Sequence, residues 1–514
     1  MPPAPTTPAA LDMNQIQGNI LAGFNKDFQA FLFLQFTDQT KGRAWLRNIA
    51  REVATTDEVL AFNKLFKRLN ARRGGELGIL KATWTNLAFT HAGLHALGVA
   101  NAELSAFPDA YKQGMKARAN VIGDVADSAP AKWAEPLKNA AIHAVLVVAS
   151  DTQADLHQQT ARYVQNLGFN GTVKLLFTQE GAVRQDEPGH EHFGFKDGVS
   201  QPGIRGLTTP DDPAKMDKGH PGQDLLWPGE FVLGYPTQDP TPGAGGDLNK
   251  VPGEVSETGP AWTKNGSFLV FRRLAQDVAA FRNFVAQQSA QTGISKEVLG
   301  AKMVGRHRSG APLEQTDAMK AAGINPNVVD PGTVDLKFTT AKFDNDFEFE
   351  DDPDGKFVPR ASHIRKVYTR DQEPPGESFT QTRRILRRGI PFGTSFRPSL
   401  GATSHGSAQA VFPHDRGLLF LCYQKSLEDQ FEFLQQTWVN NANFPQSGDG
   451  QDPIIAQRDT PRTFDFPKPS GGQHAHLQLM KHFVVTTGGE YFFQPSIDAL
   501  YHIAGVTPPA MPAG

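Results

Sequence analysis

Short apolar runs separated by glycine- and proline-rich stretches set the pattern of this chain. Four of these runs, at residues 31–36, 143–149, 267–271 and 417–423, are rich in phenylalanine, leucine or β-branched residues and are too short for buried helices. Runs of this kind predict strands. A further stretch, at 483–493, has Gly488 and Gly489 in its middle, which predicts a hairpin with a two-residue turn.

Apolar residues at helical spacing follow several of these strands. The predicted helices carry Trp45, Ile49 and Val53; residues 91–97; Leu274, Val278, Phe281 and Val285; and Leu427, Phe431, Leu434 and Trp438. Since strands and helices succeed one another in both halves, we expect an α+β design that is used twice. A glycine- and proline-rich connector covers 207–260. We therefore expect a flexible N-terminus over 1–10, an N-terminal half over 11–235 and a C-terminal half over 255–514.

The composition narrows the classes of function. In 514 residues, 51 Lys and Arg stand against 54 Asp and Glu, so the net charge is −3. This balance argues against nucleic acid or an anionic membrane as the main partner. The single cysteine, Cys422, excludes an intrachain disulfide, a thiolate zinc cluster and an iron–sulfur centre held by this chain. No apolar leader is present at the start, and the longest apolar stretch, at 140–149, is too short to span a bilayer.

One dense motif places an acid between two glycines. Residues 191–202 read EHFGFKDGVSQP, with Asp197 between Gly194 and Gly198. Glycines permit positive φ and a close approach of the backbone to a flat or bulky group. The residues alone leave two interpretations open: a carboxylate presented on a tight loop, or an ordinary Asx-turn.

Two basic segments complete the candidate chemistry. His363 lies among Arg360, Arg365 and Lys366, which suit an anionic group, although a lone histidine is more often a hydrogen-bonded structural residue. The segment 383–393 carries four arginines around an apolar pair, which fits either a solvated face or a buried cation beside a reactive centre.

Taken together, these motifs resemble those of the dye-decolourising peroxidases of the long fungal type. In order along the chain they are QGNIL at 17–21, GFKDG at 194–198, GR at 305–306 with SGAPL at 309–313, ASHIRK at 361–366, Arg387 with GIPFG at 389–393, and DRGLLF at 415–420. The resemblance implies two ferredoxin-like halves with antiparallel sheets. It also implies one non-covalent heme b in the C-terminal half.

The resemblance also implies roles for individual residues. His363 is the expected iron ligand beneath the heme, with Asp197 as acid–base and Arg387 as cation above it. Leu418 and Phe420 are expected to wall the upper pocket, since alternate residues of a strand point the same way.

Further residues are expected around the cofactor and on the route outward. Arg365 is expected to contact a propionate, and Phe195 and Ile204 to pack on the heme. Trp438 is expected either to carry an electron hole to the surface or only to pack in the core, and both interpretations stay open.

The implied function is a heme peroxidase that uses hydrogen peroxide to oxidise dyes, phenols and related aromatics, without nucleic acid or membrane as partner. Three alternatives stay open: an alkene- or carotenoid-cleaving enzyme on the same scaffold, a heme-binding carrier, and an α+β protein without cofactor. For the compartment, the resemblance favours secretion, while the absence of an apolar leader favours the cytoplasm.

Overall fold

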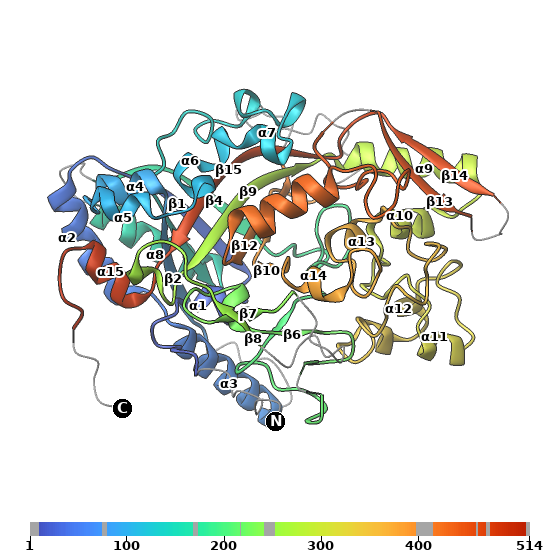
Figure 1. The fold of residues 1–514 in the computed structure, drawn as a ribbon, viewed down its shortest axis with the longest axis horizontal. Coiled ribbons are helices and arrows are strands. Elements are labelled where there is room, and N and C mark those ends of the chain that lie inside the picture. The colour runs from blue at the N-terminus through green and yellow to red at the C-terminus, as the bar shows by residue number, and fades with distance from the viewer. Residues whose placement is uncertain are drawn as a thin grey trace.

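The computed structural model describes residues 10–73, 80–167, 173–215, 217–240, 252–396, 415–458, 461–468 and 473–509. The flexible N-terminus predicted from the sequence lies, apart from residue 10, outside the described residues. A nine-stranded antiparallel sheet runs through the molecule (Figure 1). Its strands are β1 (Phe28–Phe36), β2 (Thr83–Phe89), β3 (Ala144–Ser150), β4 (Val173–Ala182), β9 (Ser267–Gln276), β10 (Leu386–Arg387), β11 (Ile390–Phe392), β12 (Gly417–Gln424) and β15 (Val484–Gln494).

The sheet consists of two ferredoxin-like halves that share one hydrogen-bonded path. The path runs β10-β12-β9-β15-β2-β3-β1-β4, with β11 paired to β12. Within each half the fourth strand lies beside the first, then the third and the second, which is the ferredoxin-like order. The halves join where Phe493 of β15 pairs with Phe89 of β2. The predicted α+β fold with two antiparallel halves is confirmed.

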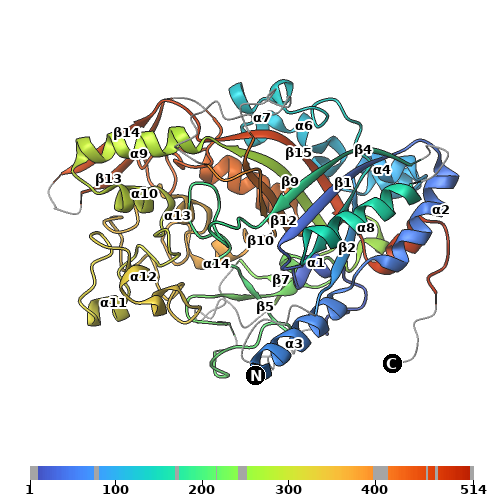
Figure 2. The ribbon, with the colours of Figure 1, turned by 180° about the vertical axis from the view of Figure 1, so that it is seen from behind.

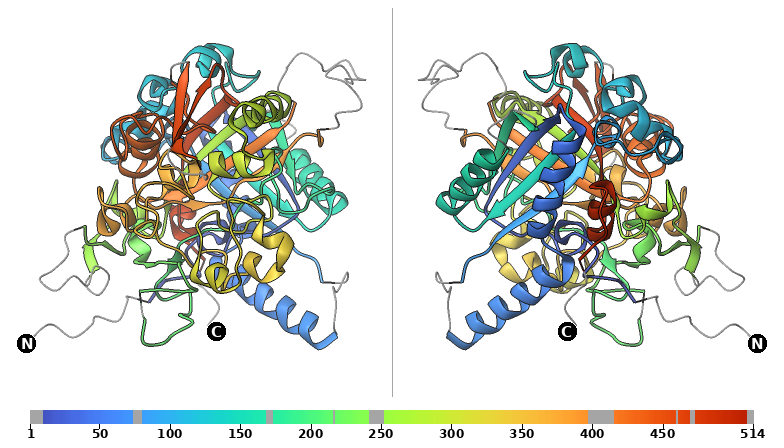
Figure 3. Two further views of the ribbon diagram at one scale, coloured as in Figure 1. Left: turned by 90° about the vertical axis from the view of Figure 1, so that its right-hand side faces the viewer. Right: turned by 90° about the vertical axis from the view of Figure 1, so that its left-hand side faces the viewer.

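Strands β1 and β3 are buried on both faces, which explains why their sequences are almost continuously apolar. In β1, Leu32 and Leu34 point into one core cluster, while Phe31 and Phe33 point into another. Helices α2 (Gln39–Ile49), α4 (His91–Ala96), α8 (Gln153–Asn166) and α15 (Ile497–Ile503) cover the first cluster. Figure 2 shows α8 lying against the strands from behind, and in Figure 3 helix α3 (Thr56–Arg73) projects from the body.

The C-terminal half carries long additions beside its sheet. They comprise α9 (Val278–Thr292), α10 (Lys296–Val304), α11 (Asp317–Ala321), α12 (Pro331–Val334), α13 (His363–Val367), α14 (Glu377–Gln381) and the ribbon β13 (Arg462–Pro467)–β14 (His474–Leu479). The helix predicted after β12 is present as two π-helical segments, η8 (Leu427–Glu432) and η9 (Leu434–Val439). Among the described residues, no helix has the length and apolar character needed to cross a membrane.

Two local predictions were wrong. The predicted hairpin at 483–493 is the single strand β15, paired along its length with β9 and bulged between Thr486 and Gly488. Its two glycines make room for neighbours: a Cβ on Gly488 would lie 2.2 Å from Leu137 Cδ1, and one on Gly489 would lie 2.3 Å from Met115 Sδ. Leu274 was predicted in a helix but lies in β9, because α9 begins only after its N-cap Asp277.

Candidate active site

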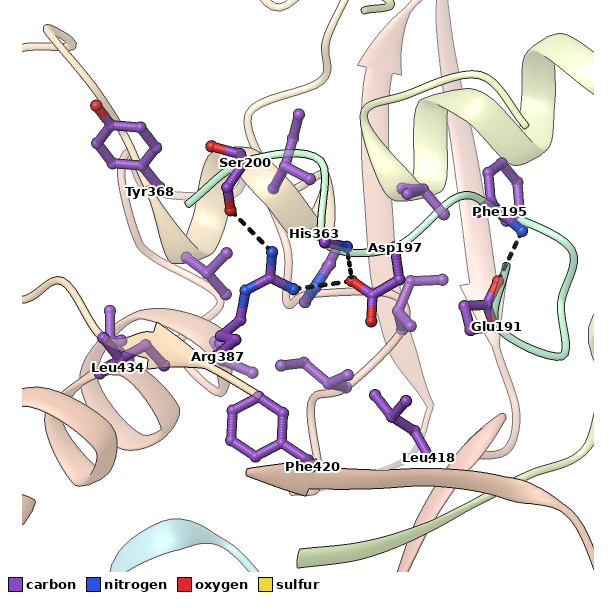
Figure 4. A pocket seen from close by; sticks show the side chains of 18 of the residues that line it. Glu191, Phe195, Asp197, Ser200, His363, Tyr368, Arg387, Leu418, Phe420 and Leu434 are labelled. Carbon is purple, nitrogen blue, oxygen red and sulfur yellow. Dashed lines mark hydrogen bonds and ion pairs between the residues drawn. The ribbon is translucent and has the colours of Figure 1, made fainter. Parts of the chain in front are cut away.

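A pocket opens between the segment 191–202 and elements of the C-terminal half (Figure 4). It contains about 1750 Å³ of empty space, part of it open to solvent. Strands β9 and β12, helix α13, the segment 383–387, η8, η9 and residues 454–457 supply most of the lining. Apolar side chains dominate, and a small number of charged groups converge among them. This combination is typical of a cofactor or substrate site.

Asp197 and Arg387 form an ion pair inside this pocket. Arg387 Nη1 donates to Asp197 Oδ1 at 2.9 Å, and its Nη2 donates to the Ser200 carbonyl at 2.9 Å (Figure 4). Gln201 fixes the backbone of Arg387, because its side chain donates to the Arg387 carbonyl at 2.9 Å and accepts from the Arg387 N–H. The two charged groups, 190 residues apart in the sequence, are thus held together by the loop 197–201 and β10.

The loop geometry satisfies both interpretations of the Asp-Gly sequence. Asp197 Oδ1 accepts the Gly198 N–H at 2.6 Å, as in a local turn, yet the carboxylate also faces the pocket. Gly194 has a φ of +97°, and a Cβ there would lie 2.3 Å from Arg308 Nη2. Only glycine therefore lets the chain pass Arg308 and present Asp197.

Electrostatics keep this carboxylate ionised. Burial alone would raise the pKa of Asp197, but the charge of Arg387 and the Gly198 N–H outweigh burial, so the pKa is lower than usual. Asp197 is consequently available as a proton acceptor in mildly acidic solution.

His363 lines the same pocket at the start of α13, and a buried acid orients its ring. Asp452 Oδ2 accepts from His363 Nδ1 at 2.8 Å, and Asp452 Oδ1 accepts the N–H groups of Ile454 and Ile455. Nδ1 is therefore the nitrogen that donates to Asp452, and Nε2 is the nitrogen available to a ligand. No described residue hydrogen-bonds Nε2. A neutral imidazole oriented by a carboxylate is the usual form of a histidine metal ligand.

Leu418, Phe420 and Phe195 lie where the sequence predicted, on the wall of the pocket. Leu418 and Phe420 alternate along β12, so both side chains point inward (Figure 4). Ile204 does not reach the pocket. It belongs to the short strand β5 (Gly203–Ile204), which pairs with β6 (Leu225–Leu226) and packs in a separate core. The expectation that Ile204 packs on a cofactor is wrong, because the chain turns away after Pro202.

Arg365 also lies outside the pocket lining, which contradicts its predicted contact. Its side chain is fully buried and donates to the carbonyls of Asp352 and Val358 at 2.9 and 2.8 Å. The physical reason is helical geometry: two residues along α13 turn a side chain by about 200° away from that of His363.

Two other arginines line the pocket, whereas Arg365 does not. Arg306 and Arg370 line the pocket, are buried and hydrogen-bond to carbonyl and amide oxygens, including Asn345 Oδ1. Neither forms an ion pair with a described carboxylate. Burial and the charge of Arg370 lower the pKa of Arg306 to about 9. Two buried cations without carboxylate partners among the described residues suit an anionic ligand.

Trp438 is not a surface residue. Its ring is 1% exposed, stacks on Phe444 at a centroid distance of 4.9 Å and contacts Phe433 edge-on. Because it lies outside the pocket lining and is covered, it cannot meet a bulky substrate directly. The packing interpretation agrees with these contacts, and transfer of an electron hole through Trp438 stays a prediction.

Cys422 lies in β12 with its thiol buried, and burial raises its pKa well above the usual range. It is therefore unsuited to act as a thiolate ligand. Within the described part of the chain, no group of three or more His, Cys, Asp or Glu side chains is placed to hold a metal ion. Among the described residues that line the pocket, His363 is the sole histidine.

Sequence reasoning missed three features of the site: Asp452, the pair Arg306 and Arg370, and Tyr368, which lines the pocket edge. Asp452 lies 89 residues from His363 in the sequence, so no local spacing signals it. Arg306 lies inside the motif GR at 305–306, and Tyr368 and Arg370 closely follow ASHIRK at 361–366. Their nearness to these motifs could therefore have marked these residues as candidates. The sequence could not show which way their side chains point.

Comparisons with known proteins identify the family. The family description "DyP dimeric alpha+beta barrel domain" fits residues 15–185, and "Dyp-type peroxidase, C-terminal" fits residues 240–446. The dye-decolorizing peroxidase AauDyP1 of Auricularia auricula-judae is 32% identical, over 97% of this chain and 89% of its own length. That of Mycena epipterygia is also 32% identical, over 98% of this chain and 90% of its own length.

Solved structures agree with the sequence relatives. An ancestral D-type dye-decolorizing peroxidase superposes with a TM-score of 0.75 at 32% identity, covering 96% of this chain and 99% of that one. A dye-decolorizing peroxidase in complex with 2,6-dimethoxyphenol gives a TM-score of 0.74 at 31% identity, covering 96% and 100%. The chain therefore belongs to the DyP-type peroxidase family, whose cofactor is heme.

Proposed function

We propose that this chain is a peroxidase that holds one non-covalent heme b through His363 and uses hydrogen peroxide to oxidise dyes, phenols and related aromatics. The observation that carries the proposal is the placement of Asp197 and Arg387 in the same pocket as a histidine whose Nε2 is free. Relatives named dye-decolorizing peroxidases, and a related structure that holds 2,6-dimethoxyphenol, support the substrate class.

The residues of the pocket fit a heme. His363 offers Nε2 as ligand to the iron, and Asp452 orients the ring through its bond to Nδ1. Leu418, Phe420 and other apolar side chains form an apolar lining. Arg306 and Arg370 are the buried cations suited to the two propionates, in place of Arg365. Heme, when bound, supplies an iron that binds peroxide and stores its oxidising equivalents.

Asp197 is the group that transfers the proton, and Arg387 supplies the positive charge beside it. Asp197 takes a proton from one oxygen of hydrogen peroxide and returns it to the other, so that the second oxygen leaves as water. Arg387 stabilises the negative charge that develops as the O–O bond lengthens, and a preorganised donor of this kind is commonly worth about 2.7–4 kcal/mol. Because Arg387 also keeps the pKa of Asp197 low, the pair is ready to accept a proton before peroxide enters.

The proposal is tested by turnover on two substrates. Heme-loaded protein is mixed with hydrogen peroxide and either an anthraquinone dye or 2,6-dimethoxyphenol, and product formation is followed by absorbance. Asp197→Asn should abolish most turnover of both substrates. Asp151→Asn, which breaks an ion pair with Lys26 at 2.6 Å outside the pocket, should not.

Two outcomes would contradict the proposal. Equal turnover by wild type and Asp197→Asn would remove the acid–base role. Peroxide-dependent cleavage of β-carotene without oxidation of dye or phenol would identify an alkene-cleaving enzyme instead.

A further inference from the structure

Tyr368 lies at the edge of the pocket, five residues after His363. Figure 4 shows its ring at the boundary of the site, with the hydroxyl directed away from Asp197 and Arg387. Among the described residues that line the pocket, it is the sole tyrosine, and no tryptophan occurs. Tyr368 is therefore the side chain of this lining that can most easily give up an electron.

The surroundings of the phenol couple electron loss to proton loss. The Tyr368 hydroxyl donates to Asp224 Oδ2, and Asp224 is almost completely buried. The Arg384 guanidinium lies 3.6 Å from the centre of the Tyr368 ring, and that of Arg370 lies 5.1 Å away. Two cations over the ring disfavour a positive charge on it. The oxidised ring can therefore exist only after the phenolic proton has left, and the carboxylate of Asp224 is the acceptor in contact.

Asp224 belongs to a charged chain that leads outward. Lys218 Nζ donates to Asp224 Oδ1 at 2.8 Å and to Glu377 Oε1 at 3.0 Å. Arg384 Nη1 adds a further contact to Asp224 Oδ2 at 3.1 Å. Lys218 and Glu377 are both about one-quarter exposed, so the chain extends from the pocket lining to solvent.

We propose that Tyr368 is a redox relay between the cofactor and aromatic reductants, with Asp224 as its proton acceptor; this inference rests on the proposed function. Tyr368 gives one electron to the peroxide-oxidised cofactor and its hydroxyl proton to Asp224, which leaves a neutral tyrosyl radical. An aromatic reductant then gives one electron to that radical, and the proton returns from Asp224 to restore the phenol. The reductant leaves as a one-electron-oxidised product that has lost a proton to water.

Two other aromatic residues of the C-terminal half are less suited to this relay. Trp438 is buried and lies outside the pocket lining. Phe392, which follows Pro391 in β11, has no hydroxyl and cannot form a tyrosyl radical. Tyr368 alone of these three combines a place on the pocket wall with a phenol in contact with a carboxylate.

The test is electron paramagnetic resonance of heme-loaded protein frozen after one equivalent of hydrogen peroxide, without reductant. Wild type should give an organic radical signal that narrows when the protein contains ring-deuterated tyrosine. Tyr368→Phe should lose this signal. Tyr163→Phe is the matched control and should keep it, because Tyr163 also contacts a carboxylate, Glu52 at 3.0 Å, but lies outside the pocket lining.

Two further measurements do not depend on correct folding of Tyr368→Phe. In unmodified wild type, a nitroso spin trap followed by peptide mass spectrometry should place its adduct on Tyr368. Asp224→Asn should slow the appearance of the radical, and Asp224→Glu should restore it. Radical loss in Tyr368→Phe together with a Tyr368 adduct supports the relay.

Failure of the relay differs from failure of the proposed function. A protein that takes up heme and consumes peroxide, but whose radical persists in Tyr368→Phe or whose adduct forms elsewhere, overturns the relay alone. A wild type that neither takes up heme nor consumes peroxide overturns the proposed function, and the relay with it.

Discussion

Replacing Asp197 by asparagine separates its chemical role from its structural role. The carboxylate accepts from Gly198 N–H at 2.6 Å and from Arg387 Nη1 at 2.9 Å, and an asparagine oxygen can accept both bonds. The loop geometry should therefore survive, while the proton acceptor is lost. General acid–base catalysis contributes about 10²- to 10⁴-fold. At about 1.36 kcal/mol per factor of ten, this corresponds to about 2.7–5.4 kcal/mol in the barrier.

The assay is stopped-flow absorbance of heme-loaded protein mixed with hydrogen peroxide at pH 6. We expect the second-order rate constant of Asp197→Asn to be about 10²- to 10⁴-fold lower than that of wild type. The heme spectrum before mixing should be unchanged. Asp151→Asn, which removes a carboxylate from an ion pair outside the pocket, serves as the control and should react like wild type. An Asp197→Asn variant that reacts at the wild-type rate would refute the assignment of Asp197 as the acid–base.

Three further variants test neighbouring parts of the account. In Arg387→Leu, the arginine charge no longer opposes burial and the pKa of Asp197 rises, so the low-pH loss of peroxide reactivity should begin at a higher pH than in wild type; an unmoved pH profile would contradict this coupling. Asp452→Ala leaves His363 Nδ1 without its partner and should weaken heme affinity about 10- to 100-fold in a heme titration; equal affinity would refute the orienting role. Trp438→Phe should leave the ratio of dye to phenol turnover unchanged, since the side chain is 1% exposed; a selective loss of dye turnover would contradict this and support the hole-carrying interpretation.

Strands β1, β3, β9 and β12 were predictable because each contains a short run of mainly buried apolar residues. The runs at 31–36 and 417–423 signal β1 and β12 through composition alone. Strand β15 shows a feature that could not be predicted from the local sequence. A Gly-Gly pair is typical of a turn, but here it gives space to Leu137 and Met115, which come from distant segments.

Within the site, the residues that the sequence located correctly lie in short contiguous motifs. The errors concern the direction in which a side chain points. Asp197 and His363 line the pocket, but Arg365 points to the opposite side of α13. Asp452 could not be identified, because any of the chain's 54 acidic residues was an equal candidate until tertiary structure brought one to His363. The sequence thus locates reactive segments better than it locates their partners.

The central claim is that His363 would ligate a heme in the pocket that also holds Asp197 and Arg387. It is tested most directly by the absorption spectrum of the purified protein, with and without added hemin and then with one equivalent of hydrogen peroxide, for wild type and His363→Ala. We predict that wild type shows a Soret band at stoichiometric heme, which changes within the mixing time after peroxide. His363→Ala should lose the band or show altered ligation. A His363→Ala protein with the wild-type Soret band at full occupancy and the wild-type response to peroxide would contradict the account.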